Sequence, residues 1–599
     1  MKNDAKDTLA RIHALSGKER RTIMKQLFGF AKYFKFQFGI SIFFALLLSV
    51  INVLLPRMLQ YFMDHYLTNM STNMQMILVF AAVYAIATIL KAVTQFVQIF
   101  FFSMGAERTL EKIRSDIFAK IHTLSLSYFD KTPAGSIVSR VTNDTKTLFD
   151  FWYLFLWIIV AAFSMISAFI AMFSVNLYLA LATALFVLAL YFLVWLYQRL
   201  SSKIYQNLRE YLSQINTKLN ESLMGINIIQ QFGQQKRMTN EFENRNGAYF
   251  LMRNKMININ ALLLYPTISL MFALAEVVSL SGFGIESTHV LVQAGVIYAF
   301  LSYQENFFNP LSDVMNFLSF FQDGMIAGYR LLHLFDNQET APQQNESSLA
   351  TITEGKIEFK HVTFAYEPGE PILKDISFVV QPGQTVAFVG HTGSGKSSII
   401  NIMLRFYEFG EGQILIDDHD IRDYSTQELR KKMGLVIQEP YLFYGDIAKN
   451  IRMFDDKITD EQIEQAGKFV DADGFIQNLP GKYHAKVSER GASFSTGQRQ
   501  LISFARTIVR NPKILILDEA TANIDPQTEQ SITVGMSKMR DDRTTIAIAH
   551  RLSTVQDADQ ILVLNHGQII EHGTHEELLA KGGHYAELYA LQSADAEPI

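Results

Sequence analysis

The residues with the clearest chemistry lie at 390–398, which read GHTGSGKSS. Gly390, Gly395, Lys396 and Ser397 match the P-loop pattern G-x-x-x-x-G-K-[ST], whose glycines let successive backbone N–H groups face a polyphosphate. We expect Lys396 to neutralise phosphate charge and the Ser397 hydroxyl to bind Mg²⁺. An apolar run precedes the motif and a segment with helical potential follows it, so a nucleoside triphosphate site is favoured over a glycine-rich turn without a ligand. The other residues expected to contact the nucleotide here are Thr392, Gly393, Ser394 and Ser398.

A second apolar run, ILILDE at 514–519, ends in two carboxylates. A buried parallel strand presents its C-terminal residues at the ligand edge of the sheet, so Asp518 is expected to reach Mg²⁺ and Glu519 the attacking water. The apolar run at 544–549 ends at His550, which is placed to contact the γ-phosphate or to orient Glu519. These residues predict transfer of a phosphoryl group to water.

Tyr366 lies upstream of the P-loop, where its ring could stack on the adenine of a bound nucleotide. A single tyrosine is more often a core or surface residue. Its position alone therefore leaves both interpretations open.

These residues need an α/β domain to position them, and the second half of the chain has the mixed, charged composition of such a domain. Strand patterns begin after a polar, turn-rich stretch without periodicity. We predict a transmembrane domain at 1–336, a linker at 337–356 and a nucleotide-binding domain at 357–599. A net charge of -5 over 599 residues argues against nucleic acid as the main partner, and the absence of cysteine excludes disulfides and thiolate metal sites.

The first half contains six apolar segments long enough to cross a bilayer as helices. Short loops rich in Lys and Arg stay in the cytoplasm, and such loops lie before the first, after the second and after the fourth segment. We therefore expect a multi-pass protein of the cell membrane with both termini in the cytosol and no cleaved signal peptide. The predicted spans are residues 36–60, 76–102, 153–174, 177–196, 259–283 and 290–320.

Two long segments between the spans, 104–151 and 199–258, carry apolar residues at helical spacing. We expect them to extend the membrane helices into the cytosol. Breaks are predicted at 130–135 and at 224–225, where turn-forming residues would leave short helices facing the soluble half.

Ionisable residues inside the predicted spans are candidates for function because burying charge in a membrane is unfavourable. Lys91 lies in the second span, Glu276 in the fifth, and Glu305 and Asp313 in the sixth. Either Glu276 or Glu305 faces a translocation cavity and attracts cationic cargo, or these residues form buried pairs between helices. The sequence leaves these two hypotheses equal.

Further segments match the nucleotide-binding domain of ABC transporters in order and spacing. Gln438 in VIQEP resembles the Q-loop, and residues 494–500, FSTGQRQ, resemble the family signature LSGGQ-x-Q. The other similar positions are Tyr366 (A-loop), 489–491 (X-loop), 522–525 (D-loop), His550 (switch histidine) and, in the membrane half, 128–135, Ser139, Arg140, Asp144 and 309–311.

This resemblance covers nearly the whole chain and implies the type IV exporter fold, with six transmembrane helices fused to one ATPase domain. It also implies a dimer, because in that family each ATP lies between one P-loop and the partner's signature segment. Ser495, Gly497 and Gln498 would then contact an ATP held by the partner. Gln438 would assist catalysis and Mg²⁺ binding within its own chain.

The chain departs from the family pattern at Thr496, where the signature has glycine. A side chain there would crowd a backbone that must approach the γ-phosphate closely. Because Lys396, Asp518 and Glu519 are intact, this asymmetry favours a heterodimer resembling paired bacterial multidrug exporters, with a partner that lacks the catalytic glutamate. A homodimer with two mildly impaired sites is the alternative.

These observations predict ATP-driven export of small amphipathic or apolar compounds, that is, multidrug efflux. A lipid flippase or peptide exporter of the same fold, and an ATP-gated channel or regulatory subunit, are the alternatives. Intact Glu519 and His550 argue against the channel. The expected partners are a second half-transporter with a degenerate Walker B segment, the lipid bilayer and a small-molecule substrate.

Overall fold

The computed structural model describes residues 17–67, 74–263, 265–518, 526–549 and 552–594. The chain forms two compact units. The first comprises Met1–Ile121 and Ala134–Asn337, and the second comprises His122–Pro133 and Gln338–Ile599. The second unit is therefore discontinuous in sequence, because a short excursion from the helical part belongs to it.

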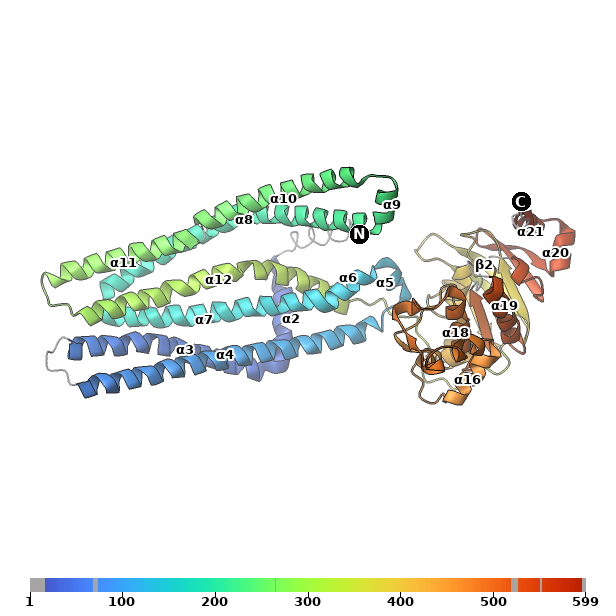
Figure 1. The fold of residues 1–599 in the computed structure, drawn as a ribbon, viewed down its shortest axis with the longest axis horizontal. Helices are drawn as coiled ribbons and strands as arrows, with labels where there is room; N and C mark the ends of the chain where they lie inside the picture. Colours follow the sequence, from blue (N-terminus) through green and yellow to red (C-terminus); the bar gives the residue numbers. More distant parts are fainter. Residues whose placement is uncertain (1–16, 68–73, 264, 519–525, 550–551, 595–599) are drawn as a thin grey trace. The chain divides into compact units, whose positions relative to one another are not determined.

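The first unit consists of long helices that run alongside one another (Figure 1). Five helical segments are long and apolar enough to cross a membrane: Gly17–Leu67, Met74–Ile121, Ala134–Val175, Leu177–Met224 and Gln235–Ser287. The helices in this unit are α2 (Gly17–Ala31), α3 (Lys35–Phe62), α4 (Met74–Ile121), α6 (Ala134–Ser139), α7 (Thr145–Val175), α8 (Leu177–Met224), α9 (Ile226–Gln231), α10 (Gln235–Leu263), α11 (Tyr265–Ser287) and α12 (Ala294–Phe335).

The sixth predicted span falls on α12, a helix of 42 residues. Gln304, Glu305 and Asn306 interrupt its apolar sequence, and α12 is not among the five segments that are apolar enough to cross a membrane. It nevertheless packs in the interior of the unit, where Phe300, Phe307 and Phe308 are buried. The polar residues of α12 must therefore be accommodated by neighbouring helices.

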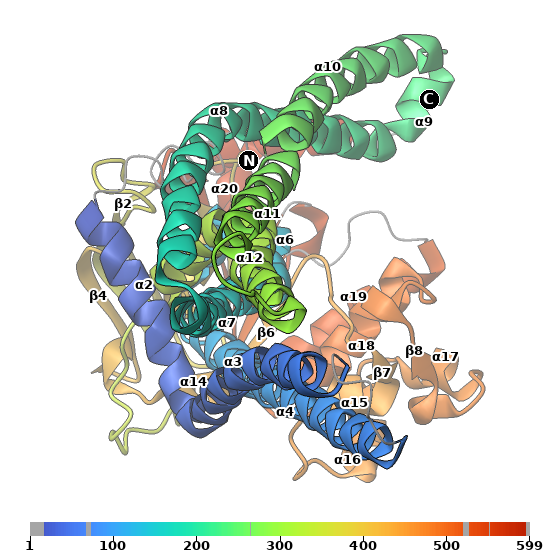
Figure 2. The ribbon, with the colours of Figure 1, turned by 90° about the vertical axis from the view of Figure 1, so that its left-hand side faces the viewer.

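The helices of the first unit pack in two groups around α7 and α12, as Figures 1 and 2 show. α3 and α4 lie together on one side, and α8, α10 and α11 lie on the other. Gln304 of α12 is fully buried and donates hydrogen bonds to Thr183 Oγ1 of α8 at 2.8 Å and to Ser279 Oγ of α11 at 2.7 Å. Such interhelical bonds hold polar residues in a membrane interior.

Two of the connections lie where the sequence patterns predicted them, and one helix ends earlier than predicted. Asn176 joins α7 to α8 in a tight turn and caps α8 by accepting from the backbone N–H groups of Tyr178 and Leu179. α4 runs without interruption from the predicted second span to Ile121, and α8 continues to Met224, where the predicted bend begins. The helix α4 ends at Ile121, before the break predicted at 130–135, and a separate short helix, α5 (Leu126–Lys131), precedes a second break at 132–133.

The second unit contains a six-stranded sheet in the order β12-β11-β3-β10-β9-β6, in which β11, β3, β10, β9 and β6 are parallel. A four-stranded antiparallel sheet has the order β2-β1-β4-β5. The strands are β1 (Ile357–Phe364), β2 (Leu373–Val380), β3 (Thr385–Val389), β4 (Glu411–Ile416), β5 (His419–Asp420), β6 (Met433–Val436), β7 (Gly445–Asp446), β8 (Lys486–Val487), β9 (Ile514–Asp518), β10 (Thr544–Ile548), β11 (Gln560–Asn565) and β12 (Gln568–Gly573).

The parallel strands form the core of this unit because helices cover the sheet. All residues of β3 and β10 are buried, as is typical of parallel strands enclosed on both faces. The helices are α13 (Lys396–Met403), α14 (Thr426–Lys432), α15 (Ile447–Arg452), α16 (Asp460–Phe469), α17 (Asp473–Gln477), α18 (Thr496–Ile508), α19 (Pro526–Arg540), α20 (His575–Lys581) and α21 (His584–Ala594).

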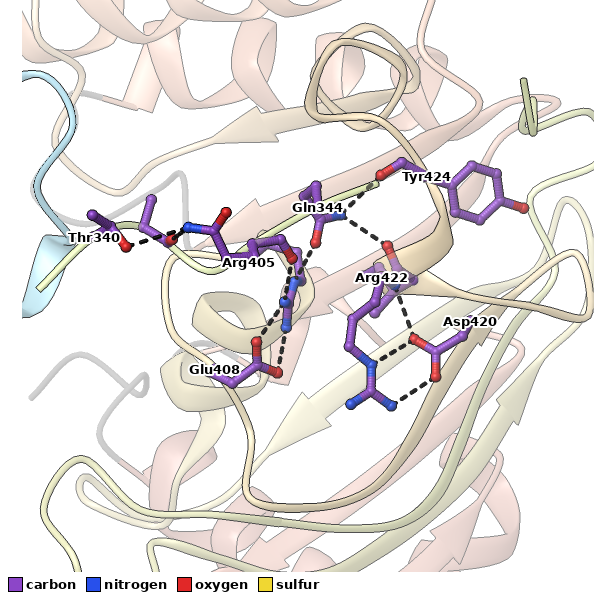
Figure 3. A network of polar contacts seen from close by, with 10 residues as sticks. Thr340, Gln344, Arg405, Glu408, Asp420, Arg422 and Tyr424 are labelled. Atoms are coloured by element: carbon purple, nitrogen blue, oxygen red, sulfur yellow. Dashed lines mark hydrogen bonds and ion pairs between the residues drawn. The ribbon is translucent and has the colours of Figure 1, made fainter. Parts of the chain in front are cut away.

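The stretch predicted as a linker is bound to the second unit along much of its length. Asp417 accepts hydrogen bonds from the backbone N–H groups of residues 353–356 at 2.8 to 3.1 Å. Gln344 accepts from Arg405 Nε at 2.9 Å and donates to the carbonyl oxygens of Ile421 and Tyr424 (Figure 3). Arg405 is buried and also forms a bidentate pair with Glu408.

The short helix α5 packs onto the same unit. The Tyr407 hydroxyl donates a hydrogen bond to the Asp130 carboxylate, and Leu124 forms a β-bridge with Thr340 of the linker. The backbone N–H of Ser125 also donates to the carbonyl of Glu339 at 2.9 Å. Burial and the contact with Asp130 raise the pKa of Tyr407, so this phenol stays protonated at physiological pH.

Candidate functional site

The P-loop connects the end of β3 to the start of α13, as its sequence predicts. Gly390 and Gly395 have φ values of 149° and 107°, which L-amino acids with a side chain rarely adopt. A Cβ atom at Gly390 would lie 2.3 Å from the carbonyl oxygen of Leu564 on β11. The glycines are therefore required both for the backbone conformation and for close packing against the neighbouring strand.

Lys396 is the first residue of α13 and is 5 % exposed. Its ammonium group donates to the carbonyl oxygens of Gly390 at 2.8 Å and His391 at 3.0 Å, across the mouth of the loop. The helix N-terminus adds partial positive charge at the same place. This arrangement concentrates positive potential where the sequence predicts the phosphates of a nucleotide.

The remaining P-loop residues divide into exposed and buried ones. His391, Thr392, Gly393 and Ser397 are exposed, whereas Ser394 and Ser398 are buried. The Ser394 carbonyl accepts from the Gly567 backbone N–H at 3.0 Å, which fixes the loop to the turn after β11. Ser397 therefore presents its side chain at the surface of the site, as a ligand to a metal ion must.

Tyr366 is connected directly to the P-loop helix. Its hydroxyl lies 3.1 Å from Ser398 Oγ and accepts from Asn401 Nδ2 at 2.8 Å, both on α13. The ring also makes edge contacts with Phe364 and Tyr407 and remains 38 % exposed. The structure thus holds this ring beside the P-loop with part of its surface accessible for stacking.

The strand order brings the other predicted residues to the same edge of the sheet. β9 ends at Asp518, and β6, its neighbour, ends at Val436 two residues before Gln438. β10 lies between β9 and β3 and ends at Ile548, two residues before the predicted site residue at position 550. Because these strands are parallel, their carboxyl ends and the P-loop meet at one edge. The predicted residues Glu519 and His550, and the D-loop at 522–525, lie outside the described residues.

The signature segment forms the N-terminus of α18. Ser495 caps the helix through a capping box with Gln498, so the side chain of each bonds to the backbone N–H of the other. Thr496 is the first residue of the helix, and its Oγ1 accepts from Arg499 Nη2 at 3.2 Å. The backbone at Thr496 is therefore ordinary helix, and the substitution adds a methyl and a hydroxyl group without a strained φ angle.

Comparison with known proteins identifies both halves of the chain. Residues 38–311 match the model of the ABC transporter transmembrane region, and residues 373–522 match the ABC transporter model. A Streptococcus pneumoniae protein named ABC transporter ATP-binding protein exp8 is 46 % identical over 96 % of this chain and 98 % of its own length. The chain belongs to the ABC transporter family.

Other similar ABC transporters carry more specific names. YheH of Bacillus subtilis, named as a multidrug resistance ABC transporter ATP-binding/permease protein, is 40 % identical over 84 % of this chain and 75 % of its own. A Mycobacterium bovis protein named fatty acid ABC transporter ATP-binding/permease protein is 36 % identical over 81 % of this chain and 77 % of its own.

Among solved structures, a bacterial Atm1-family ABC exporter with ATP bound is similar to this chain. The TM-score is 0.77 at 28 % identity, over 94 % of this chain and 99 % of that one. The predicted fold class, a helical transmembrane domain fused to an ABC ATPase domain, is confirmed, and so is the assignment to the type IV exporters. The chain is a half-transporter of this kind, an ATPase that drives transport across a membrane.

The structure of this ABC transporter also shows contacts that the sequence did not predict. Three side chains of the signature helix α18 donate to carbonyl oxygens that flank Gln438: Thr507 to Leu435 at 3.0 Å, Gln500 to Ile437 at 3.5 Å, and Arg506 to Tyr441 at 2.9 Å. The signature and the Q-loop are therefore joined by one helix.

Of these three side chains of α18, Arg506 makes the most hydrogen bonds. It also donates to the carbonyl and the Oδ1 of Asn450 on α15, at 2.8 and 3.0 Å. Burial lowers the pKa of Arg506 to about 10, so the guanidinium remains charged at neutral pH. In the sequence, this role is indicated by an arginine within the apolar run LISFARTI. A charged side chain at such a position needs hydrogen-bond partners.

The residues at the strand ends fit a Mg²⁺ ion held together with a nucleotide. Among the residues that the structure describes, no cluster of three or more His, Cys, Asp or Glu side chains could hold a metal without other ligands. The Ser397 hydroxyl, the Gln438 amide and the Asp518 carboxylate offer only oxygen ligands. Mg²⁺ prefers such ligands and typically takes one or two protein groups with phosphate oxygens.

Proposed function

We propose that this ABC transporter exports small amphipathic or apolar compounds from the cell, as one half of a heterodimer with one degenerate ATP site. The observation that carries the proposal is the pairing of an intact P-loop edge with an altered signature. Lys396, Gln438 and Asp518 share the carboxyl edge of the sheet, while Thr496 places a side chain where the family has glycine. Multidrug resistance in the name of a relative supports the cargo class.

The chain's own residues suggest how it would hydrolyse ATP. Mg²⁺, when bound, would offset the charge of the β and γ phosphates. Lys396 would bind the same phosphates, and the Tyr366 ring would stack on the base. Asp518, Ser397 and Gln438 would orient the metal, Glu519 would position the water, and His550 would orient Glu519 or contact the γ-phosphate. Ser495, Gly497 and Gln498 would complete the partner's site.

Exposed apolar side chains at the far end of α8 support a partner chain. Leu223, Met224, Ile228 and Phe232 are between 64 % and 92 % exposed at the turn formed by α8 and α9. Clusters of exposed apolar residues mark surfaces that another molecule covers. In the proposed dimer, the partner's ATPase domain covers this turn. The distribution of Lys and Arg supports a cytosolic position for this turn and for both termini.

Fatty acid or lipid export is the second candidate, because a relative carries a fatty acid transporter name. Assays on membrane vesicles distinguish the two. If the first proposal holds, vesicles that contain this chain and its partner accumulate an amphipathic dye when ATP is supplied. Transport of fatty acids or lipids without transport of the dye would favour the second candidate.

Glu519→Gln tests the hydrolytic role. We expect nucleotide binding within about twofold of the unmodified chain and loss of most turnover, since the water would lose the group that positions it. Near-normal hydrolysis by the Glu519→Gln chain would refute the assignment of Glu519 to the attacking water.

Lys396→Ala should instead weaken nucleotide binding, which equilibrium binding of a fluorescent ATP analogue measures.

The heterodimer is tested by purifying the chain alone. We expect ATP turnover to stay near background until a second half-transporter with a regular signature is added. Strong drug-stimulated turnover by the isolated chain would show that a homodimer is the working form.

A further inference from the structure

The membrane half contains a cavity of about 230 Å³ lined by residues of α3, α4, α7 and α12. A single ordered water needs only about 10–15 Å³ of such space, so the cavity has room for a substantial part of a small molecule. Its walls combine apolar side chains with an unusual number of polar ones for a membrane interior.

Two opposite charges line this cavity. Lys91 projects from α4 and Asp313 from α12. Within the part of the chain that the structure describes, neither side chain takes part in an ion pair or hydrogen bond. An ionised group inside a membrane is unfavourable unless it is paired or solvated. The two charges therefore lack the direct contact that would explain them as a structural pair.

Uncharged polar groups face the same space. Gln98 of α4 is 4 % exposed and has no hydrogen-bond partner among the described residues, so its buried amide is left for the cavity. Asn52 Oδ1 and Trp157 Nε1, which also belong to lining residues, are buried without a partner. Buried polar atoms are nearly always satisfied by protein, water or ligand. Residues around the cavity thus carry unsatisfied polar atoms beside the two charges.

The residues that sequence analysis singled out as attractants for cations do not line this cavity. Glu305 is exposed and accepts from Asn309 at 3.4 Å, and Glu276 lies on α11, which contributes no lining residue. The charge of the cavity is therefore balanced, with one cationic and one anionic side chain. A purely cationic ligand would satisfy Asp313 and leave Lys91 uncompensated.

We propose that this cavity binds an amphiphile whose polar group is zwitterionic. The anionic part of the ligand pairs with Lys91, the cationic part pairs with Asp313, and the amides of Asn52 and Gln98 bond to polar atoms between them. Leu48, Leu156 and Val160, which also line the cavity, contact the apolar part. This inference rests on the proposed export function and narrows its cargo class, but the binding itself does not require ATP.

The test uses four amphiphiles with the same dodecyl chain and different head groups. They are zwitterionic dodecyl betaine, cationic dodecyltrimethylammonium, anionic dodecanoate and neutral dodecyl maltoside. The full-length chain, with its partner subunit where one copurifies, is placed in lipid nanodiscs without nucleotide. Binding is followed by tryptophan fluorescence, because Trp157 lines the cavity. A contact with a charged group is worth roughly tenfold or more in affinity, so the betaine should bind about tenfold more tightly than each singly charged probe.

Variants assign this preference to the two side chains. Lys91→Met should remove the advantage of the betaine over the cationic probe, and Asp313→Asn should remove its advantage over the anionic probe. Lys91→Arg keeps the charge and should retain the preference. Glu276→Gln, which removes a charge outside the cavity, serves as the matched control and should leave all four affinities unchanged.

Equal affinities for the four probes would overturn the proposal. So would a parallel loss of all four affinities in Lys91→Met and Asp313→Asn, since that pattern marks a structural pair bridged by water. The lipid composition of the nanodisc shows whether the natural ligand is a membrane lipid or a compound from the aqueous phase. If a membrane lipid is the natural occupant, phosphatidylethanolamine in the nanodisc competes with the betaine and raises its Kd several-fold relative to pure phosphatidylglycerol. A cargo from the aqueous phase predicts the same Kd in both.

The two proposals fail separately. Selective binding of the betaine without ATP-dependent transport of any compound would contradict the export function and leave the binding site intact. Transport without a head-group preference would contradict the zwitterionic site alone.

Discussion

Thr496 illustrates how much one side chain at the ATP site can matter. Ser495 still caps α18, and the Thr496 hydroxyl is engaged by Arg499 of the same helix. The signature segment therefore keeps its backbone shape. In the proposed dimer, an effect of the substitution on ATP hydrolysis would therefore come from the extra atoms of Thr496 beside the partner's nucleotide.

Thr496→Gly is expected to raise ATP turnover of the assembled dimer if the signature limits its site. The gain should be about fivefold, the factor that ~1 kcal/mol of barrier represents. Glycine in a helix also lowers the free energy of unfolding by about 1 kcal/mol, although the first turn is tolerant. Turnover is measured by phosphate release at saturating ATP.

Thr496→Ala is the matched control, because it removes the hydroxyl and keeps the Cβ atom. We expect less than half of the gain from this variant. If turnover is unchanged in both variants, the partner's Walker segment limits the second site.

At the residue scale, the sequence predicted sites whose residues lie close together in the chain. The P-loop could be recognised because its glycines, Lys396 and Ser397 are contiguous. Lys91 and Asp313 could be recognised as unusual membrane residues, but their separation of more than two hundred positions gave no sign that they line one cavity. Glu276 was equally unusual and lies outside it.

At the scale of elements, α18 is the helix that connects the signature to the Q-loop. Its N-terminus carries Ser495 as a cap, and Arg506 near its other end holds the backbone of Tyr441 and Asn450. A displacement of the Q-loop segment would therefore move α18 with it. In the proposed dimer, α18 would therefore transmit a change at the proposed Mg²⁺ site to the surface that meets the partner.

Arg506→Lys tests this connection. Lysine keeps the charge but cannot reproduce the planar fork that contacts three acceptors. Loss of two such bonds should lower the free energy of local unfolding by ~2 kcal/mol. Amide exchange of residues 441–452 should then accelerate by about thirtyfold. Hydrogen exchange followed by mass spectrometry measures this within the full chain.

Arg510→Lys provides the comparison for this experiment. Arg510 is exposed, lies four residues further on, and makes no hydrogen bond to another described residue. Exchange in 441–452 should be unaffected. Equal exchange in the two variants would show that Arg506 does not hold the segment.

The elements were predictable where periodicity is strong. The long helices follow from apolar runs and helical spacing, and Asn176 marks the tight turn between α7 and α8. α12 was harder, because Gln304 and its neighbours lower its hydrophobicity while partners on α8 and α11 satisfy them. The linker was predicted as a polar connection without structure of its own, and its bonds to Asp417 and Arg405 depend on residues far along the chain.

At the scale of the whole molecule, the chain leaves its helical unit at Ile121 and returns to it at Ala134. Residues 122–133 instead pack with the ATPase unit through Tyr407 and the linker. Tyr407 also contacts the ring of Tyr366, whose hydroxyl lies 3.1 Å from Ser398 Oγ on the P-loop helix. The nucleotide site and α5 are therefore separated by two aromatic side chains.

Tyr407→Phe should loosen α5 without removing a group that contacts ATP. A hydrogen bond to a charged acceptor contributes roughly 1.5–3 kcal/mol, so amide exchange in residues 126–131 should accelerate at least tenfold. Tyr444→Phe, at a tyrosine that is 71 % exposed, is the control and should have no effect on α5.

The pH dependence of this contact has a definite sign. Because the folded pKa of Tyr407 is raised, its stabilising bond is fully present below the unfolded pKa of about 10 and is lost only as pH rises through the folded value. Protection of α5 should therefore be constant between about pH 6 and pH 9, once exchange is corrected for its intrinsic pH dependence. A loss of protection within that interval would show that another group controls α5.

The bond between Asp130 and Tyr407 also has a consequence for synthesis of the chain. The two residues are 277 positions apart. A ribosome adds about 5–20 residues per second, so α5 leaves the ribosome roughly 15 to 55 seconds before the residue that fixes it. During that interval the nascent helical hairpins enter the bilayer while the loop at their end has no docking surface. The ATPase domain, made last, therefore completes a structure whose other half is already inserted in the membrane.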